Sequence, residues 1–565
     1  MAEEQGSGAT SALVRWVVAG ELTPAVSGKT MRLTRGSLGE VMRAMQLDVS
    51  VELPDALGDQ EQRQFSLTFR EPGDFKMKSV VAAVPELRDL SELAGAFDRT
   101  NPDKRPSIQN AIEQVVSLVG EGTLAAGLRA LENPEPESAA AGSAANGGSN
   151  GGSETGGGVS IDAIFDKAEV KTSAQKASSA VSAFVSTMRK NAGTQPPKTG
   201  SAKSKAARRL LEDAVYAVAA DILQAPEVTK LERTWLGIKQ LLANIPTTGD
   251  LDILLLDSGW DAYPQALEAL LPDDPVEWPD CFFLLEPCDD PEKLREVAAL
   301  CEGLNVPAVV AAHDAVFGEH AASEAAHSAD ELAQSLPDGW EALRAEESSR
   351  WLSMVLNGMV VVAEGSGQYQ RVVVGSPALT AASLLSRSFS ATGSFGMVFG
   401  PKGGMEAPAV QKLTSGQYAD TMVPTADFIS ARSQSELAGL GFAAFGSARN
   451  SDKVLLANWP TLCSSGDAFP LPAQIIAGRI VRFAIWVRDQ LPPSVEKEQV
   501  PQIFEDAAAV FLFPGIREGA KVTAELVDKD DSSRELAVGA QVSAPLAGIP
   551  LMLAFPLPLP GATAN

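Results

Sequence analysis

The sequence predicts a multi-domain protein that joins a small α+β unit to a larger α/β unit with a mixed or parallel sheet. Its 565 residues suffice for two to four domains, since one core usually serves about 100 to 200 residues. In the C-terminal part, buried strands alternate with amphipathic helices, the order typical of a parallel sheet. A tract of Gly, Ser, Asn and Ala separates that part from the N-terminal unit.

The N-terminal unit, residues 1–132, carries the α+β pattern. Residues 31–53 predict a strand, a turn, a helix and a second strand. In "RQFSLTFR" (63–70) apolar and polar residues alternate, which predicts a half-buried strand. Helices interrupted at Pro85 follow.

Three segments connect the two units. Residues 133–160 have no apolar periodicity and cannot offset their ordering entropy by burial, so they predict a flexible linker. A short helical segment (161–188) and a polar linker (189–206) come next. The large region then runs from 207 to 565.

The large region opens with an amphipathic helix, because Leu231, Trp235 and Leu242 fall on one helical face. Strand and helix patterns then alternate, and two strands surround an acidic turn near the end. In order, the predicted segments are strands 251–259 and 280–287, helix 290–305, strand 306–313, helix 473–491, and strands 521–527 and 535–542.

Charge and composition exclude several classes of partner. Lys and Arg number 46 against 72 Asp and Glu, a net charge of −26, whereas nucleic acid requires a basic face. No apolar run reaches the roughly 18 residues of a membrane span, and the N-terminus lacks a signal-peptide pattern. Four cysteines in so long a chain fit a reducing compartment. We therefore expect a cytoplasmic protein with no nucleic-acid partner and no membrane insertion.

Candidate catalytic and metal-binding residues are few. Asp257 ends a predicted strand, where α/β enzymes often place a catalytic acid, so an α/β hydrolase or transferase stays open as an alternative. No nucleophile or base stands beside it, which favours a turn residue. His313, His320 and His327 are seven residues apart, unlike the i, i+3 or i+4 spacing of metal ligands. We expect no catalytic site, no metal site and no cofactor.

A family resemblance begins at residues 222–242, "ILQAPEVTKLERTWLGIKQLL". This segment resembles the opening of the main folded region in the large sheath subunit of type VI secretion systems. Later segments resemble the same family in the same order, including its W-x-x-x-R…S-R-[YW] and E-L-x-x-x-G-F lines. The matching residues are Leu231, Glu232, Trp235, Gly237, Trp340, Arg344, Arg350, Glu436, Gly441 and Phe442.

The N-terminal unit is similar to the small sheath subunit of the same systems. Residues 67–93 couple an F-x-x-x-x-D-F turn to a V-P-x-L-R-x-L line. The residues that match are Phe69, Asp74, Phe75, Pro85, Leu87 and Arg88. The chain therefore resembles a small and a large sheath subunit fused through a Gly-rich tether.

This resemblance implies a structural subunit without enzymatic activity. Such subunits polymerise into a helical tube around an inner tube and contract to drive secretion. The implied partners are further copies of the chain, the inner tube protein and a baseplate. Exchanged β-strands would join the copies, with candidates at 13–18, 521–527 and 535–542. The resemblance also implies an AAA+ recycling unfoldase that binds a docking helix, whose apolar face here would be Ile161, Ile164, Phe165 and Ala168.

One departure from the family pattern keeps an alternative open. Where the family usually reads P-R-x-L-x-R-x-P-Y-G, this chain reads "LNGMVVVAEGSG" (356–367). A sheath-related baseplate or cap component that does not polymerise is therefore the second hypothesis.

Overall fold

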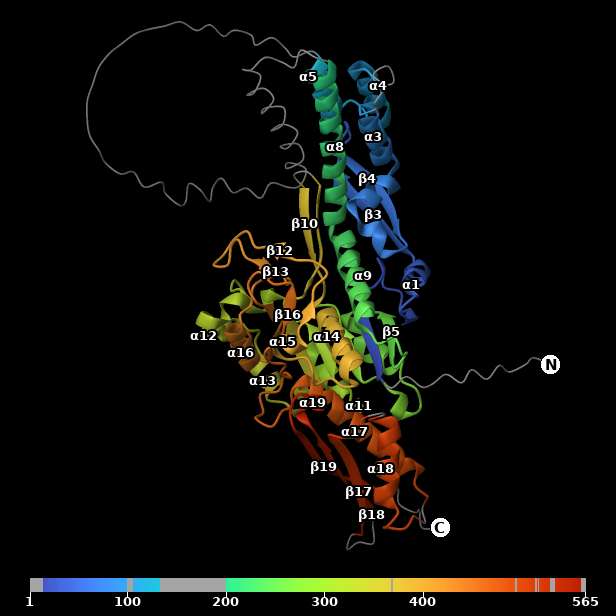
Figure 1. Ribbon diagram of the computed structural model, residues 1–565, viewed down its shortest axis with the longest axis vertical. Coiled ribbons are helices and arrows are strands. Elements are labelled where there is room, and N and C mark those ends of the chain that lie inside the picture. Colours follow the sequence, from blue (N-terminus) through green and yellow to red (C-terminus); the bar gives the residue numbers. More distant parts are fainter. Residues whose placement is uncertain are drawn as a thin grey trace, which may run out of the picture.

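The computed structural model describes residues 14–98, 105–132, 200–366, 369–492, 495–513, 516, 518–528 and 534–559. Figure 1 shows an elongated molecule with N-terminal helices at one end, a large sheet in the middle and a small C-terminal sheet at the other end. None of the helices in these ranges has the length and apolar character needed to span a membrane.

The middle of the molecule is a seven-stranded sheet in the order β14-β8-β7-β6-β1-β5-β2, in which only β2 is antiparallel to its neighbour. This confirms the predicted mixed, mostly parallel layer. Its strands are β1 (Val14–Gly20), β2 (Thr30–Leu33), β5 (Leu251–Asp257), β6 (Cys281–Leu284), β7 (Ala308–Ala311), β8 (Leu352–Leu356) and β14 (Phe442–Ala444).

Strand β1 lies inside this sheet, between β5 and β6. The strand at 13–18, a candidate for exchange between copies, is therefore paired on both sides within its own chain. The physical reason is visible in "VRWVVAG", a nearly continuous apolar run that suits a strand buried on both faces of a parallel sheet. As a result, the N-terminal unit and the large region share one sheet.

Helices cover both faces of the sheet. Buried side chains of α9, α14 and α17 form one core with Trp16 and Ile253, and those of α10, α11, α12, α13 and α16 form a second core with Val17 and Phe282. The bounds of these helices are α9 (Pro226–Asn244), α14 (Pro377–Thr392), α17 (Leu471–Gln490), α10 (Tyr263–Glu268), α11 (Pro291–Leu304), α12 (Ala325–Ser335), α13 (Trp340–Arg344) and α16 (Ala431–Gly439).

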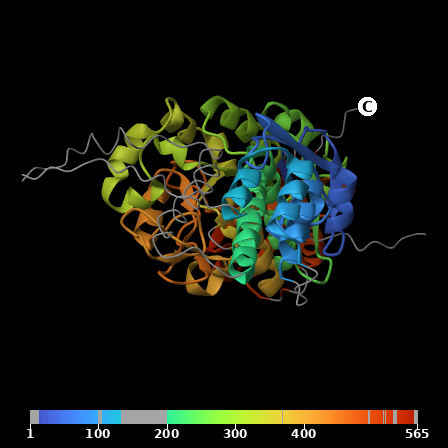
Figure 2. The same cartoon turned by 90° about the horizontal axis from the view of Figure 1, so that it is seen from above.

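The N-terminal unit is α+β, as expected: an antiparallel hairpin of β3 and β4 packs with helices. Its elements are α1 (Leu38–Met45), β3 (Leu47–Pro54), β4 (Gln62–Phe69), the 3-10 turn η1 (Pro72–Phe75), α2 (Met77–Ala83), α3 (Pro85–Ala96), α4 (Ile108–Val119) and α5 (Thr123–Glu132). Figures 1 and 2 show α3 and α5 beside α8 (Gly200–Gln224), a long helix of the large region. Helix α8 begins inside the predicted polar linker 189–206, since "AKSKAARRLLEDA" is rich in good helix formers.

The C-terminal end is a three-stranded antiparallel sheet in the order β17-β18-β19, flanked by α18 and α19. Both predicted strands exist, and β18, which contains the candidate exchange strand 535–542, has neighbours on both sides within its own chain. Sequence reasoning missed β19, because Pro556 and Pro558 are atypical of strands. The bounds are α18 (Val500–Phe511), β17 (Ala520–Asp528), β18 (Arg534–Val542), α19 (Ala544–Ala547) and β19 (Leu551–Pro558).

Short hairpins complete the fold. The hairpin of β9 (Val360–Ser366) and β10 (Tyr369–Val374) stands beside α8 and α9 in Figure 1. The remaining small elements are α15 (Gly400–Gly403), β11 (Met405–Glu406), β12 (Gln411–Lys412), β13 (Met422–Val423), β15 (Gly446–Ser447) and β16 (Lys453–Leu455).

Candidate functional site

A buried aspartate joins the N-terminal unit to the sheet. The Asp257 side chain, at the end of β5, is fully buried. Its Oδ1 accepts hydrogen bonds from the amides of Leu22 (2.8 Å) and Thr23 (3.2 Å). Its Oδ2 accepts from the Thr23 hydroxyl (2.6 Å), the Ser27 amide (2.7 Å) and the Ser27 hydroxyl (2.6 Å). Asp257 therefore anchors the loop after β1, and both its oxygens are occupied. This overturns its candidacy as a catalytic acid.

Charged side chains fill the carboxyl edge of the sheet beside Asp257. Lys230 forms ion pairs with Glu21 and, at 3.6 Å, with Glu286. The Trp260 indole donates to the Glu286 carbonyl at 3.0 Å. In α/β enzymes this edge is where the ligand crevice opens. Here its polar groups bind one another and hold the loops together.

A second polar junction centres on Arg371 of β10, whose side chain is only 5% exposed. Its guanidinium forms a bidentate pair with Glu232 of α9, at 2.5 Å and 2.9 Å. Arg371 Nε donates to Glu364 of β9 at 2.7 Å. Burial raises the pKa of Glu232, against the lowering effect of the hydrogen bonds and charge of Arg371. This network ties α9 to the β9–β10 hairpin.

The same network contacts the N-terminal unit at the turn between η1 and α2, which we call the corner. Arg371 Nη2 donates to the Phe75 carbonyl at 2.8 Å. The Met77 amide donates to Glu364 Oε1 at 3.2 Å. Three segments far apart in the sequence therefore meet at one buried ion network.

The corner is shaped by motif residues of the N-terminal unit. The Phe69 ring stacks on the Phe75 ring, with centroids 4.2 Å apart and an interplanar angle of 10°. Asp74 Oδ2 accepts from the amides of Arg70 (2.7 Å) and Glu71 (3.0 Å). These contacts fix the backbone that Arg371 and Glu364 bind.

The other motif residues of this unit lie on α3. Pro85 occupies the first turn of the helix, where its missing amide hydrogen costs nothing. Leu87 is fully buried in the core. Arg88 is exposed and contacts Asp89 at 3.2 Å, so no role in the junction follows for it.

Helix α9 carries motif residues of the large region to both junctions, Glu232 to the Arg371 network and Trp235 to the loop bound by Asp257. The Trp235 indole is buried and donates to the Leu22 carbonyl at 3.0 Å. Leu231 is buried on the same face. At Gly237 a Cβ atom would lie 2.6 Å from Leu379 Cδ1, so the glycine lets α14 approach closely. Trp235 therefore binds the N-terminal unit directly, whereas Glu232 is linked to that unit through Arg371.

The later motif residues form a separate cluster on the opposite face of the sheet. Trp340 stacks on Phe442, with centroids 5.0 Å apart and an angle of 6°. Arg344 is buried and donates to the carbonyls of Gly439 (2.8 Å) and Leu462 (3.2 Å). The W-x-x-x-R motif and the E-L-x-x-x-G-F motif are therefore neighbours in the fold, where their residues pack against each other.

Gly441 provides a direct test of this cluster. Its φ is +93°, and a Cβ atom there would lie 2.9 Å from Leu462 Cδ1 and 3.2 Å from Arg344 Nε. We expect Gly441→Ala to lower the free energy of unfolding by about 1 to 3 kcal/mol in urea titrations, because the backbone conformation is strained for alanine. Gly439→Ala is the matched control, since a Cβ at Gly439 meets nothing within 4 Å. Equal stability of the two variants would contradict the assigned role.

Two motif residues border this cluster. Arg350 forms an ion pair with Glu347 in the 3-10 turn η7 (Glu347–Trp351), which contacts α13. Glu436 is half-buried on α16, which contacts β14.

The histidines do not form a metal centre. The His313 ring accepts a hydrogen bond from the Ala315 amide at 3.1 Å and caps a 3-10 turn. His320 is half-buried and His327 is exposed. Across the ranges of the chain given above, no group of three His, Cys, Asp or Glu side chains could hold a metal ion.

The predicted unfoldase-docking residues Ile161, Ile164, Phe165 and Ala168 lie outside the described residues, and this prediction stays untested.

Sequence reasoning missed one further buried ion pair. Arg482 of α17 donates to Asp280 at 2.6 Å, and the Arg15 amide donates to the same carboxylate at 3.0 Å. Burial lowers the pKa of Arg482 to about 10. The sequence does contain a sign of such buried pairs, because Arg482 in "GRIVRFAIW" and Arg371 in "YQRVVVG" each lie beside several apolar residues.

The contacts above define an α/β scaffold whose buried polar groups join distant segments. Residues 20–120 match the family model described as "Type VI secretion system, VipA, VC_A0107 or Hcp2". No curated protein matches the chain.

Several solved structures are similar at low identity. The sheath complex of an extracellular contractile injection system (PVC) in its contracted state is 11% identical, with a TM-score of 0.32, covering 59% of this chain and 78% of that chain. The baseplate of the anti-feeding prophage is 10% identical, with a TM-score of 0.30 and the same coverage. The contracted helical sheath of that prophage is 10% identical, with a TM-score of 0.31, covering 58% and 79%.

Proposed function

We propose that this chain is a structural subunit of a contractile type VI secretion sheath, in which a small and a large sheath subunit are fused. The observation that carries the proposal is the match of residues 20–120 to the small-subunit family model. The way that this segment is built into the rest of the chain supports the fusion. Its strand β2 pairs with β5, and its main chain binds Asp257, Trp235 and Arg371.

In this proposal, copies of the chain polymerise around an inner tube protein, attach to a baseplate and contract to drive secretion. The polymer is cytoplasmic, and an AAA+ unfoldase recycles it by binding the segment that contains Ile161, Ile164, Phe165 and Ala168. Head-to-tail contacts that do not close a ring generate such a helical polymer.

The C-terminal sheet has two edge strands to which a strand from another copy could add, β19 and β17, the second of which also contacts α18. The hydrogen bonds from the Ser543 amide to the Gly519 carbonyl and from the Leu559 amide to the Arg534 carbonyl set the alternation of the ladder. By that alternation, even-numbered residues of both β17 and β19 direct their amide and carbonyl groups outward.

Prolines distinguish the two edges. On β19, Pro556 and Pro558 stand at outward positions and lack the amide hydrogen that an added strand would bind. On β17, the outward residues Val522, Ala524 and Leu526 all retain it, and the register with β18 has no bulge. We therefore place strand addition at β17.

This assignment predicts opposite effects for two matched proline substitutions. Ala524→Pro removes an outward amide hydrogen from β17, so we expect the folded protein to lose polymers that pellet in an ultracentrifuge. Ala554→Pro removes the equivalent group from β19, and we expect it to pellet like the parent protein. Circular dichroism checks that both variants fold. Pelleting of the Ala524→Pro variant at the parent level would refute strand addition at β17.

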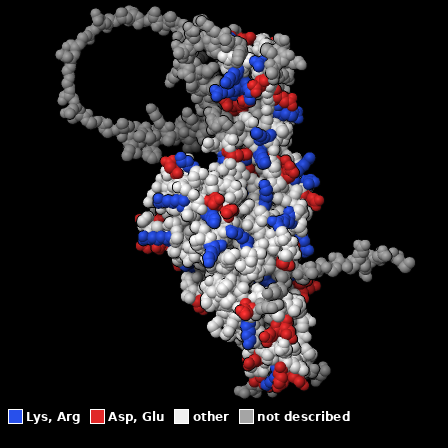
Figure 3. Space-filling model, in the orientation of Figure 1, with Lys and Arg blue, Asp and Glu red and all other residues white. Residues whose placement is uncertain are grey.

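The charge of the C-terminal end gives this polymer a salt dependence. Figure 3 shows acidic side chains together with a few basic ones at the end that carries β17 and β18; Glu525 is exposed there, and Asp528 pairs with Lys497 and Arg534. Copies that meet there repel one another at low ionic strength, and salt screens this repulsion. Pelleting should accordingly increase with salt.

A further inference from the structure

At two junctions the large region binds the main chain of the N-terminal unit, whereas elsewhere the two are also joined by ion pairs such as Lys230 with Glu21 and Arg32 with Asp252. At the first junction Asp257 binds the amides of Leu22, Thr23 and Ser27, and Trp235 binds the Leu22 carbonyl. The side-chain hydroxyls of Thr23 and Ser27 also donate to the Asp257 carboxylate.

At the corner the contacts are of the same kind. Arg371 binds the Phe75 carbonyl and Glu364 accepts from the Met77 amide. A cation thus meets a carbonyl and an anion meets an amide, while the N-terminal unit supplies no charge of its own.

Local structure explains why these main-chain groups are available. Met77 is the first residue of α2, and the first amides of a helix have no partner within it. The neighbouring turn bonds use other carbonyls: the Ser79 and Val80 amides both donate to Lys76. The corner therefore presents one donor and one acceptor, two residues apart.

The binding side is preorganised. Arg371 and Glu364 are cross-strand partners in the β9–β10 hairpin, and Nη1 and Nη2 of Arg371 both donate to the Glu232 carboxylate. A bidentate pair fixes the plane of an arginine, so the second N–H bond of Nη2 points in one direction. That direction is the Phe75 carbonyl.

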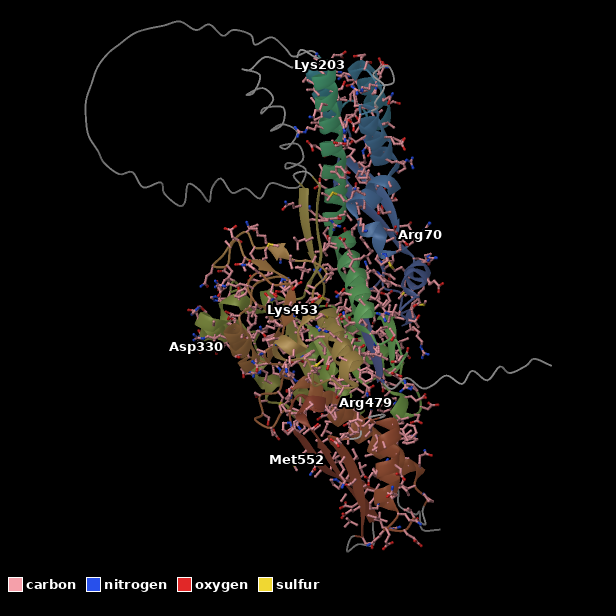
Figure 4. All side chains as sticks on the ribbon, viewed as in Figure 1. Arg70, Lys203, Asp330, Lys453, Arg479 and Met552 are labelled. Atoms are coloured by element: carbon pink, nitrogen blue, oxygen red, sulfur yellow. The ribbon has the colours of Figure 1, made fainter. Side chains whose placement is uncertain are left out.

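From these contacts we infer that at the corner the large region recognises the N-terminal unit by the shape of its backbone, through the hydrogen bonds of Arg371 and Glu364. The partner that fits this surface is any α+β unit with the same corner, whatever side chains it exposes nearby. Exposed side chains at the corner, such as Arg70 in Figure 4, do not enter the recognition. This inference does not depend on polymerisation.

The test uses the full chain with a protease site inserted between residues 133 and 160. The folded protein is cleaved, and release of the N-terminal fragment is followed by gel filtration at a fixed urea concentration. Met77→Pro removes the amide hydrogen that binds Glu364, at a helix position that tolerates proline, and Lys76 before it is already extended (ψ 142°). Met77→Ala is the matched control, because it loses the side chain but keeps the amide.

We expect Met77→Pro to release the fragment roughly tenfold faster than Met77→Ala, as for loss of a hydrogen bond to a charged group. A variant with Arg70, Lys76 and Lys78 all changed to Ala should release at the parent rate. Equal rates for the two Met77 variants would overturn the inference, as would fast release from the triple variant.

A second measurement avoids any folding defect of the proline variant. Hydrogen exchange of the Met77 amide should become at least about tenfold faster in Glu364→Ala, because its acceptor is lost, while the Val81 amide within α2 keeps its protection. Unchanged exchange at Met77 would also overturn the inference.

Discussion

Replacing Asp257 with alanine should lower the free energy of unfolding by at least about 2 kcal/mol. The buried amides of Leu22 and Thr23 lose their acceptor in this variant, and each unsatisfied buried group costs about 1 to 3 kcal/mol. Urea unfolding followed by circular dichroism measures the change. A loss below about 1 kcal/mol would show that the loop after β1 does not depend on this carboxylate.

The pH dependence of the free energy of unfolding tests separately whether the charge of Asp257 stabilises the fold. Burial opposes ionisation, but hydrogen bonds from Ser27, Thr23 and Leu22 together outweigh it and lower the pKa of Asp257. The stability that the carboxylate contributes is therefore complete above its unfolded pKa of about 3.9 and is lost as the pH falls through the folded value. Asp257→Asn cannot titrate, so its stability should fall less between pH 5 and pH 2. Parallel curves for the two proteins would contradict this account.

Glu232→Ala should have the second large effect. The substitution leaves the Arg371 guanidinium buried and without its bidentate partner, and such changes cost about 3 to 5 kcal/mol. The double variant Glu232→Met with Arg371→Met is the control, because it removes both charges and keeps apolar volume. We expect it to be more stable than Glu232→Ala in urea titrations. The reverse order would contradict the assigned ion pair.

The parts of the fold that sequence predicts best are those with strong local patterns. The predicted strands 251–259 and 306–313 each contain a run of apolar residues (253–256 and 308–312), and the face shared by Leu231 and Trp235 has helical spacing. The α+β character of the N-terminal unit also follows from alternation at 63–70. These features need no knowledge of distant segments.

The remaining features depend on contacts between distant segments. No local pattern indicates that β1 pairs between β5 and β6, because pairing partners are set by tertiary packing. The ion pair of Glu232 with Arg371 joins residues 139 positions apart. Strand β19 is hidden by its prolines, which are tolerated because they fall at outward edge positions; Figure 4 shows the exposed Met552 on the same strand.

Electron microscopy of the purified full-length chain tests the proposed sheath function most directly. Negatively stained samples, alone and with the inner tube protein, should contain hollow helical tubes or stacked rings with a central channel. Discrete globular particles under every condition would contradict a polymerising sheath subunit and favour a sheath-related baseplate or cap component.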